Sequence, residues 1–216
     1  MKRQQVILAL ATVITGATIL ILAFYVFPEY RNQNLLIDSG DLIIDIKYPL
    51  TGQTAIDNDI KAFINENVRK VKQLPPSPAN DPRNWKNELY ITYDKPYINP
   101  KYVSLVFYVM VYSGGAHPNT IVVTKNYDKR TGRQLRLSDI ISTGKEQLRA
   151  MIKSKLYQSL DQPNVKWVRQ GVDASDLETF SFNLFSITFY FSQYEVAPYA
   201  NGIQKVNFSL KALQPD

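Results

Sequence analysis

Tyr112-Ser113-Gly114-Gly115-Ala116-His117-Pro118-Asn119 is the stretch around which the fold is organised. It separates two runs of aromatic and β-branched residues, 102–111 and 120–124, that their composition predicts to be strands. The Gly-Gly pair permits backbone angles closed to other residues and lets another group approach the main chain closely. Pro118 fixes its own φ and restricts His117 to extended conformations. The sequence therefore predicts a rigid loop between two strands, and this loop presents the single histidine of the chain.

The strand before this loop, Tyr102 to Tyr112, is apolar on both faces, which is typical of a central strand covered on both sides. High aromatic content, with 14 Tyr and 10 Phe, also favours a strand-rich fold. The other predicted strands are short runs bounded by turn residues: 42–48, 88–93, 120–128, 134–137, 180–185, 187–191 and 203–210.

Two stretches carry apolar residues at helical spacing. The first runs from Ile56 to Val71 and ends before the proline-rich segment 74–82, and the second runs from Glu146 to Leu160. The polar stretch 161–179 is predicted to be a loop, with Trp167 as its anchor. Strands that alternate irregularly with two main helices predict an α+β fold with antiparallel or mixed sheets.

The first part of the chain contains an uncharged stretch of 22 residues, Val6 to Phe27, long enough to cross a bilayer as a helix. Lys2 and Arg3 precede it, so residues 1–5 are expected to be a cytoplasmic tip and everything after Pro28 extracytoplasmic. The apolar run is longer than the roughly 7–15 residues of a signal-peptide core and lacks a small-residue cleavage site, which favours an uncleaved signal anchor. We expect a polar tether over 28–39, a strand–helix subdomain over 40–82 and a C-terminal α+β domain over 83–216.

Composition excludes several classes of function. With no cysteine and one histidine, the chain cannot form disulfides, thiolate zinc sites or the usual His/Cys metal sites, and no metal or cofactor is predicted. The net charge is +6, with Lys and Arg scattered singly, so no nucleic-acid partner is predicted. Weak attraction to anionic wall polymers or lipid head groups is the more natural consequence.

Several pieces of sequence occur in a fixed order: 112–119, 127–132, 135–140, 190–191 and 194–202. The pieces 114–118 and 194–202 are each distinctive. Together they resemble the family of domain of unknown function 3298, over about Tyr97 to Leu213. Residues 44–73 resemble domain of unknown function 4163, which often precedes it. Phe185-Ser186 departs from the family pattern, which commonly has an acidic-Gly turn in this hairpin.

The resemblance implies a bacterial, extracytoplasmic, membrane-tethered module with an α+β fold. The best-known relatives are the outer part of an anti-sigma factor that recognises lysozyme and the front half of a peptidoglycan deacetylase. Five residues before the apolar stretch are too few for a sigma-binding domain, and one histidine cannot supply the deacetylase metal site, so we expect a sensing or accessory module. The expected partners are the membrane, through residues 6–27, and a lysozyme-like protein, peptidoglycan or an anionic wall polymer. Lys2 and Arg3 account for two of the net charges, and the remaining +4 would slow the approach of a cationic lysozyme.

The candidate ligand-binding residues lie in two segments. The first contributes Tyr112, Gly114, Gly115, His117 and Asn119, and the second contributes Tyr194, Glu195 and Tyr199. A carboxylate between two aromatic rings could stack a sugar and bind its hydroxyls. The favoured interpretation is structural: Glu195 accepts backbone N–H groups in a turn, and His117 donates to a backbone carbonyl.

A catalytic alternative combines Ser113 with His117, oriented by Asp128 or Glu195. Ser113 is not on a strand-to-helix elbow, so we predict no catalytic residue and no enzyme activity. A single carboxylate also gives no support to a paired-acid glycosidase. A cell-wall hydrolase and a scaffold for envelope proteins remain as alternatives to the binding module.

Overall fold

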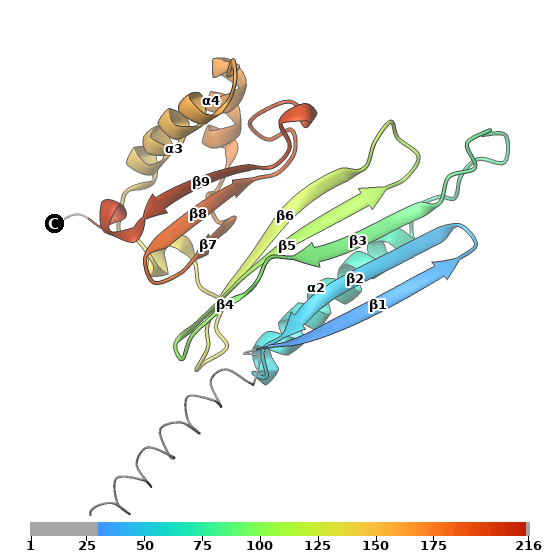
Figure 1. Ribbon diagram of the computed structural model, residues 1–216, viewed down its shortest axis with the longest axis horizontal. Helices are drawn as coiled ribbons and strands as arrows, with labels where there is room; N and C mark the ends of the chain where they lie inside the picture. The colour runs from blue at the N-terminus through green and yellow to red at the C-terminus, as the bar shows by residue number, and fades with distance from the viewer. Residues whose placement is uncertain (1–29, 215–216) are drawn as a thin grey trace, which may run out of the picture.

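The computed structural model describes residues 30–214, which form two sheets side by side, each covered on one face by helices (Figure 1). The first sheet contains β1 (Arg31–Ser39), β2 (Leu42–Leu50), β3 (Asn87–Tyr93), β4 (Tyr97–Ile98), β5 (Tyr102–Tyr112) and β6 (Asn119–Asp128), with helix α2 (Thr54–Lys72). The second contains β7 (Phe180–Phe182), β8 (Ser186–Phe191) and β9 (Gln204–Ser209), with α3 (Lys145–Ser159) and α4 (Val165–Ala174). Short 3₁₀ turns occupy Leu137–Asp139, Tyr199–Asn201 and Leu210–Leu213.

The first sheet has the strand order β1-β2-β3-β5-β4, and β6 pairs with β5 along its other edge. Only β2 and β3 are parallel, and α2 supplies the crossover that a parallel pair requires. The helix buries Ile56, Ile60 and Ile64 against apolar residues of β2, β3 and β5. Its first turn is capped by the Gln53 side chain, which accepts from the Ile56 backbone N–H at 2.8 Å. The expected strand–loop–strand is present as β5 and β6, paired in register from Tyr102 opposite Asp128 to Val111 opposite Asn119.

The segment expected to be a tether differs in the structure, because residues 31–39 form β1. Leu35 lies opposite Ile46 and Ile37 opposite Ile44, and both half-buried side chains pack on the α2 core. Their alternation is hard to see in the sequence, since Asn and Gln residues surround it and Leu36 between them is exposed. The predicted anchor, residues 6–27, lies outside the described residues. Across 30–214, no helix combines the length and apolar character needed to span a membrane.

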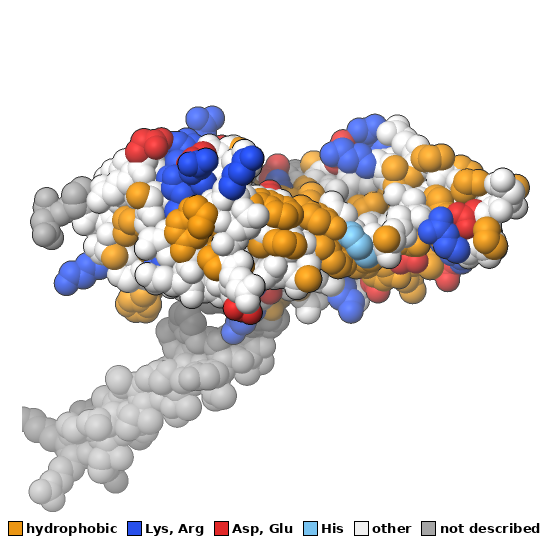
Figure 2. Space-filling view, turned by 90° about the horizontal axis from the view of Figure 1, so that it is seen from above, with side chains coloured by type: hydrophobic (Ala, Val, Ile, Leu, Met, Phe, Trp, Pro, Cys, Tyr) orange, Lys and Arg blue, Asp and Glu red, His pale blue; other side chains and the backbone are white. Residues whose placement is uncertain are grey.

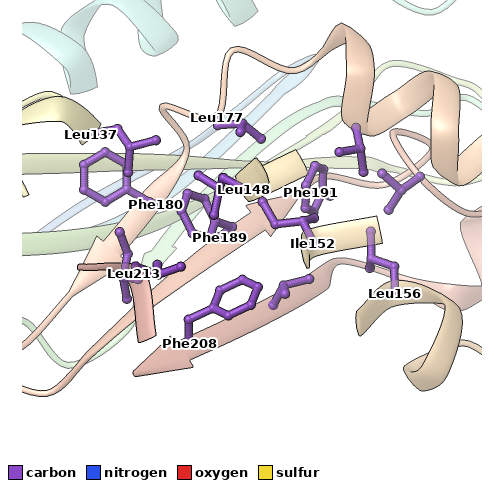
Figure 3. Packing of buried hydrophobic residues seen from close by; sticks show 14 of the residues in the cluster. Leu137, Leu148, Ile152, Leu156, Leu177, Phe180, Phe189, Phe191, Phe208 and Leu213 are labelled. Carbon is purple, nitrogen blue, oxygen red and sulfur yellow. The ribbon is translucent and has the colours of Figure 1, made fainter. Parts of the chain in front are cut away.

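The second sheet is antiparallel, in the order β7-β8-β9, and α3 and α4 cover one face. Figure 3 shows Leu148, Ile152 and Leu156 of α3 directed at aromatic residues of the sheet. Those aromatic residues are Phe180, Phe189, Phe191 and Phe208. The core of this C-terminal domain therefore consists of aliphatic helix residues against sheet phenylalanines. The domain is smaller than the expected 83–216, because β3 to β6 pair within the first sheet.

Helix α4 is a correction to the sequence prediction, which assigned 161–179 to a loop. Asn164 caps it by accepting from the Trp167 backbone N–H at 3.0 Å. Val168 and Val172, at i and i+4, are fully buried. A single pair of apolar positions around Gly171 is too short a pattern to stand out in a polar stretch. The described chain thus has three α-helices, and the α+β class with mixed and antiparallel sheets is confirmed.

A buried polar network joins the two sheets. The Ser104 hydroxyl of β5 donates to Asn126 Oδ1 of β6 at 2.7 Å, and Asn126 Nδ2 donates to the Phe180 carbonyl of β7 at 2.7 Å. The Phe182 backbone N–H donates back to Ser104 Oγ at 3.1 Å. Because each of these groups finds a partner, the network fixes how β7 docks on the β5–β6 pair.

Candidate functional site

The loop between β5 and β6 meets the turn 194–202 at the surface. The His117 ring is stacked on the Tyr199 ring, with centroids 3.7 Å apart and an interplanar angle of 22°. His117 Nε2 lies 2.9 Å from the Tyr194 hydroxyl. We call His117, Tyr194 and Tyr199 the aromatic cluster. Figure 2 shows the half-buried imidazole, in pale blue, reaching the surface beside a group of hydrophobic side chains in orange.

Hydrogen bonding sets the tautomer of His117. Its Nδ1 lies 3.0 Å from the Pro118 carbonyl oxygen, which can only accept, so Nδ1 carries the proton. In the neutral imidazole Nε2 is then an acceptor, and the Tyr194 hydroxyl donates to it. The structure thus gives His117 the expected bond to a backbone carbonyl and adds a side-chain bond to the other segment. Within residues 30–214, His117 makes no hydrogen bond to Ser113.

Tyr194 has an unusual backbone conformation. Its φ is 69°, in the left-handed region, while 46% of its side chain area is exposed. A non-glycine residue in this region costs on the order of 1–3 kcal/mol and persists only where its surroundings impose it. Here Trp167 Nε1 of α4 donates to the Tyr194 carbonyl at 3.0 Å, and the tyrosine hydroxyl is held by His117.

Gly171 of α4 lets the turn approach the helix. A Cβ at this position would lie 1.9 Å from the Glu195 carbonyl oxygen, so only glycine fits. Glu195 Oε2 accepts from the Ser192 backbone N–H at 2.7 Å, which is the structural role expected for this carboxylate. Desolvation raises the pKa of Glu195, although the Ser192 hydrogen bond opposes the shift.

Tyr112 and Gly114 belong to a different contact. Gly114 has a φ of 86°, and a Cβ there would lie 2.2 Å from the Trp85 ring. The Tyr112 ring meets Trp85 edge-on at 6.3 Å, and Arg83 Nη1 donates to the Gly114 carbonyl at 2.9 Å. These two candidates therefore anchor the 81–85 loop, whereas Gly115 and Asn119 are exposed beside the aromatic cluster.

The sequence predicted all three residues of the aromatic cluster as ligand-binding candidates, but it did not predict the helix that positions Tyr194. Trp167 is the anchor that the sequence indicates in 161–179, but it lies on the unpredicted helix α4 and its partner is the Tyr194 carbonyl; Gly171 lies on the same helix and no local motif marks it. In the described part of the chain, no three His, Asp or Glu side chains gather where they could hold a metal ion.

The fold and surface define a two-domain α+β module in which an N-terminal sheet carries the loop and a C-terminal sheet carries the turn. Residues 33–120 match the family described as "Deacetylase PdaC", and residues 134–211 match "Protein of unknown function (DUF3298)". The chain thus carries a PdaC-type domain followed by a DUF3298 domain, and the expected resemblance is confirmed. The loop 112–119 falls in the PdaC-type match, and the DUF3298 match begins later than the expected start near Tyr97.

A similar curated protein is the peptidoglycan-N-acetylmuramic acid deacetylase PdaC of Bacillus subtilis (strain 168). The identity is 28% over 95 residues, which is 44% of this chain and 20% of the deacetylase, so the match spans about a fifth of that protein.

Two similar solved structures are DUF3298 family proteins. The one from Bacteroides fragilis NCTC 9343 has 18% identity and a TM-score of 0.60, covering 85% of this chain and 91% of that one. The one from Pseudomonas aeruginosa PAO1 has 15% identity and a TM-score of 0.63, covering 86% and 93%. At these identities the comparison shows a shared fold.

Proposed function

We propose that this chain is a membrane-anchored, extracytoplasmic module that binds a cell-wall glycan and leaves it chemically unchanged. The similarity of its first domain to part of a peptidoglycan deacetylase supports peptidoglycan as the class of ligand. The uncharged stretch 6–27, preceded by Lys2 and Arg3, supports the anchor and the orientation.

The conformation of Tyr194 is the main support for this binding site. A strained backbone supports a half-exposed ring, and contacts from α4 and from the other domain hold it there. Strain at an exposed side chain is typical of ligand-binding positions. A ring fixed in advance loses little conformational entropy when a ligand stacks on it, which favours affinity. Tyr194 and Tyr199 also offer hydroxyls that can bind sugar hydroxyl groups.

A glycan fits this surface better than a cationic lysozyme-like protein does. The aromatic cluster carries no carboxylate, and the net charge of the chain is positive, so electrostatic attraction to a cationic protein is missing. An anionic wall polymer would be attracted by charge, but stacked rings select a sugar face more than a phosphate.

The test is calorimetric titration of the full chain with soluble peptidoglycan fragments, comparing Tyr194→Ala with Leu36→Ala. Leu36 is 73% exposed on β1 and serves as the matched control. We expect Tyr194→Ala to weaken binding about tenfold, which corresponds to about 1.4 kcal/mol, and Leu36→Ala to leave it unchanged. Equal affinity for both variants would refute this site, and binding of lysozyme without glycan binding would refute the ligand class.

The same mixtures test the absence of catalysis. Mass spectrometry of the fragments after incubation should show no loss of acetyl groups and no cleavage. Turnover that disappears with Ser113→Ala would establish the hydrolase alternative instead. Membrane fractionation, with protease added outside intact cells, should find the chain in the membrane with its folded part accessible.

A further inference from the structure

A groove lies at the junction of the two domains, away from the aromatic cluster. It has a volume of about 380 Å³ and is formed where the β3–β4 connection faces β7 and β8. Asp94 and Tyr97 lie on one side, and Ser181, Thr188 and Tyr190 on the other. This volume is within the roughly 300–1,000 Å³ of small-molecule sites. We call it the junction groove.

The lining of the junction groove is rich in hydroxyl groups. Ser181 Oγ and the Tyr190 hydroxyl lie 2.9 Å apart, and Thr188 Oγ1 accepts from Asn207 Nδ2 at 2.8 Å. Each hydroxyl can donate one hydrogen bond and accept two, so capacity remains for a ligand. Tyr97 adds a half-buried aromatic ring, held edge-on to Phe182 at a centroid distance of 6.4 Å.

Two charged residues line the groove, the acidic Asp94 and the basic Lys95. The Asp94 carboxylate accepts from the Tyr108 hydroxyl at 2.7 Å, and the one carboxylate and one ammonium group of the lining balance each other in sum. A groove without a dominant charge selects neither an anion nor a cation. Hydroxyls beside one aromatic ring fit a neutral polyhydroxyl ligand, that is, a sugar.

The junction groove and the aromatic cluster lie along the same line, where β5 and β6 face β8, which we call the domain seam; the middle of the seam, at Val106, Val122 and Tyr190, is buried. Tyr190 lines the groove and packs against Val106 and Val122 in the middle of the seam. Further along, the Val122 backbone N–H donates to Ser192 Oγ at 3.0 Å, and two residues later Tyr194 reaches His117. From Ser104 at the groove to Tyr112 at the loop, β5 advances about 26 Å at 3.3 Å per residue.

We propose that the junction groove is a second sugar-binding subsite, and that one linear glycan chain reaches from this groove to the aromatic cluster. The proposal rests on the proposed function and adds to it the form of the ligand, an extended chain and not a single sugar unit. When a glycan chain is bound at one subsite, the effective concentration of its other sugar units at the second subsite is high. Affinity therefore increases with the length of the glycan once it can reach both subsites.

The test is titration of the full chain with a soluble peptidoglycan disaccharide and with long soluble glycan chains. We expect the long chains to bind at least about tenfold more tightly than the disaccharide. Thr188→Ala and Tyr97→Ala should remove this advantage, whereas the control Leu36→Ala should keep it. Thr188→Ala removes one hydroxyl and one methyl group from a half-buried position, a smaller change than loss of the Tyr97 ring, so it keeps the test valid if Tyr97→Ala fails to fold.

The outcomes separate the two proposals. If long chains bind no better than the disaccharide, or if both groove variants keep the advantage, the groove subsite is refuted and the proposed function stands. If Tyr194→Ala has no effect while Thr188→Ala weakens binding to every fragment, the aromatic cluster is refuted and the groove is the principal site. If no fragment binds, both proposals fail.

Discussion

Gly171→Ala is expected to disturb the aromatic cluster from a position that does not belong to it. Gly171 lies within α4, where the backbone of Glu195 passes so closely that a Cβ would be 1.9 Å from the carbonyl oxygen and 2.8 Å from the carbonyl carbon. In proteins a Cβ essentially never lies within 3.0 Å of a non-bonded heavy atom, so the Glu195 carbonyl must move away from residue 171 by more than 1 Å. Since Trp167 of the same helix holds the Tyr194 carbonyl, the movement reaches Tyr194 directly.

Two effects of opposite sign determine how much Gly171→Ala changes the free energy of unfolding. Alanine stabilises a helix interior by about 1 kcal/mol relative to glycine. Overpacking costs about 1–3 kcal/mol, and here the obstacle is backbone, which cannot rotate out of the way. We therefore expect a net loss of up to about 2 kcal/mol, equivalent to a fall in the melting temperature of at most roughly 4–8 °C, together with weaker glycan binding.

The assay is thermal unfolding of the full chain followed by tryptophan fluorescence, combined with calorimetric titration. Gln170→Ala, on the exposed side of the same helix, is the matched control and should keep both stability and affinity. If Gly171→Ala melts higher than the parent chain, helix propensity outweighs the close contact and the proposed positioning role of α4 is wrong.

The remaining predictions concern the polar contacts between elements. Asn126→Ala removes the centre of the buried network: the Ser104 O–H loses its acceptor, although Ser104 Oγ still accepts from the Phe182 N–H, and the Phe180 carbonyl loses the Asn126 donor, which should cost about 1–3 kcal/mol in urea unfolding. Ser104→Ala combined with Asn126→Ala should cost less than the sum of the single changes, and strict additivity would contradict the network. For Asp59, burial would raise the pKa, but hydrogen bonds from Lys125 at 2.6 Å and Tyr127 at 2.5 Å outweigh it and lower the pKa. Because the pKa of Asp59 is lower in the folded state, its ionised carboxylate stabilises the folded state at pH values above the unfolded pKa of about 3.9. This stabilisation is lost as the pH falls through the folded-state pKa. The difference in melting temperature between the parent chain and Asp59→Asn should therefore be widest near neutral pH and should disappear in acid.

The local predictions succeeded where several neighbouring residues carry the same signal. The β5–β6 pair around the Gly-Gly loop, the six apolar positions of α2 and the leucine spacing of α3 are each repeated over more than two turns or five strand positions. The signal was too weak for β1, where only Leu35 and Ile37 alternate on the core side, and for α4, where only Val168 and Val172 are buried. In both cases tertiary contact, not propensity, decides the structure.

Local sequence is enough to predict a rigid loop that presents His117 and a separate turn that presents Tyr194 and Tyr199, because Gly, Pro and aromatic residues act on their immediate neighbours. The contact between His117 and Tyr194, 77 positions apart, and the support of the turn by Trp167 and Gly171 arise from the packing of the folded chain. This packing also creates the junction groove, from segments that carry no common motif. The physical reason is that these contacts depend on how two sheets dock, and docking is set by the summed packing and hydrogen bonds of residues such as Ser104 and Asn126, which no local pattern encodes.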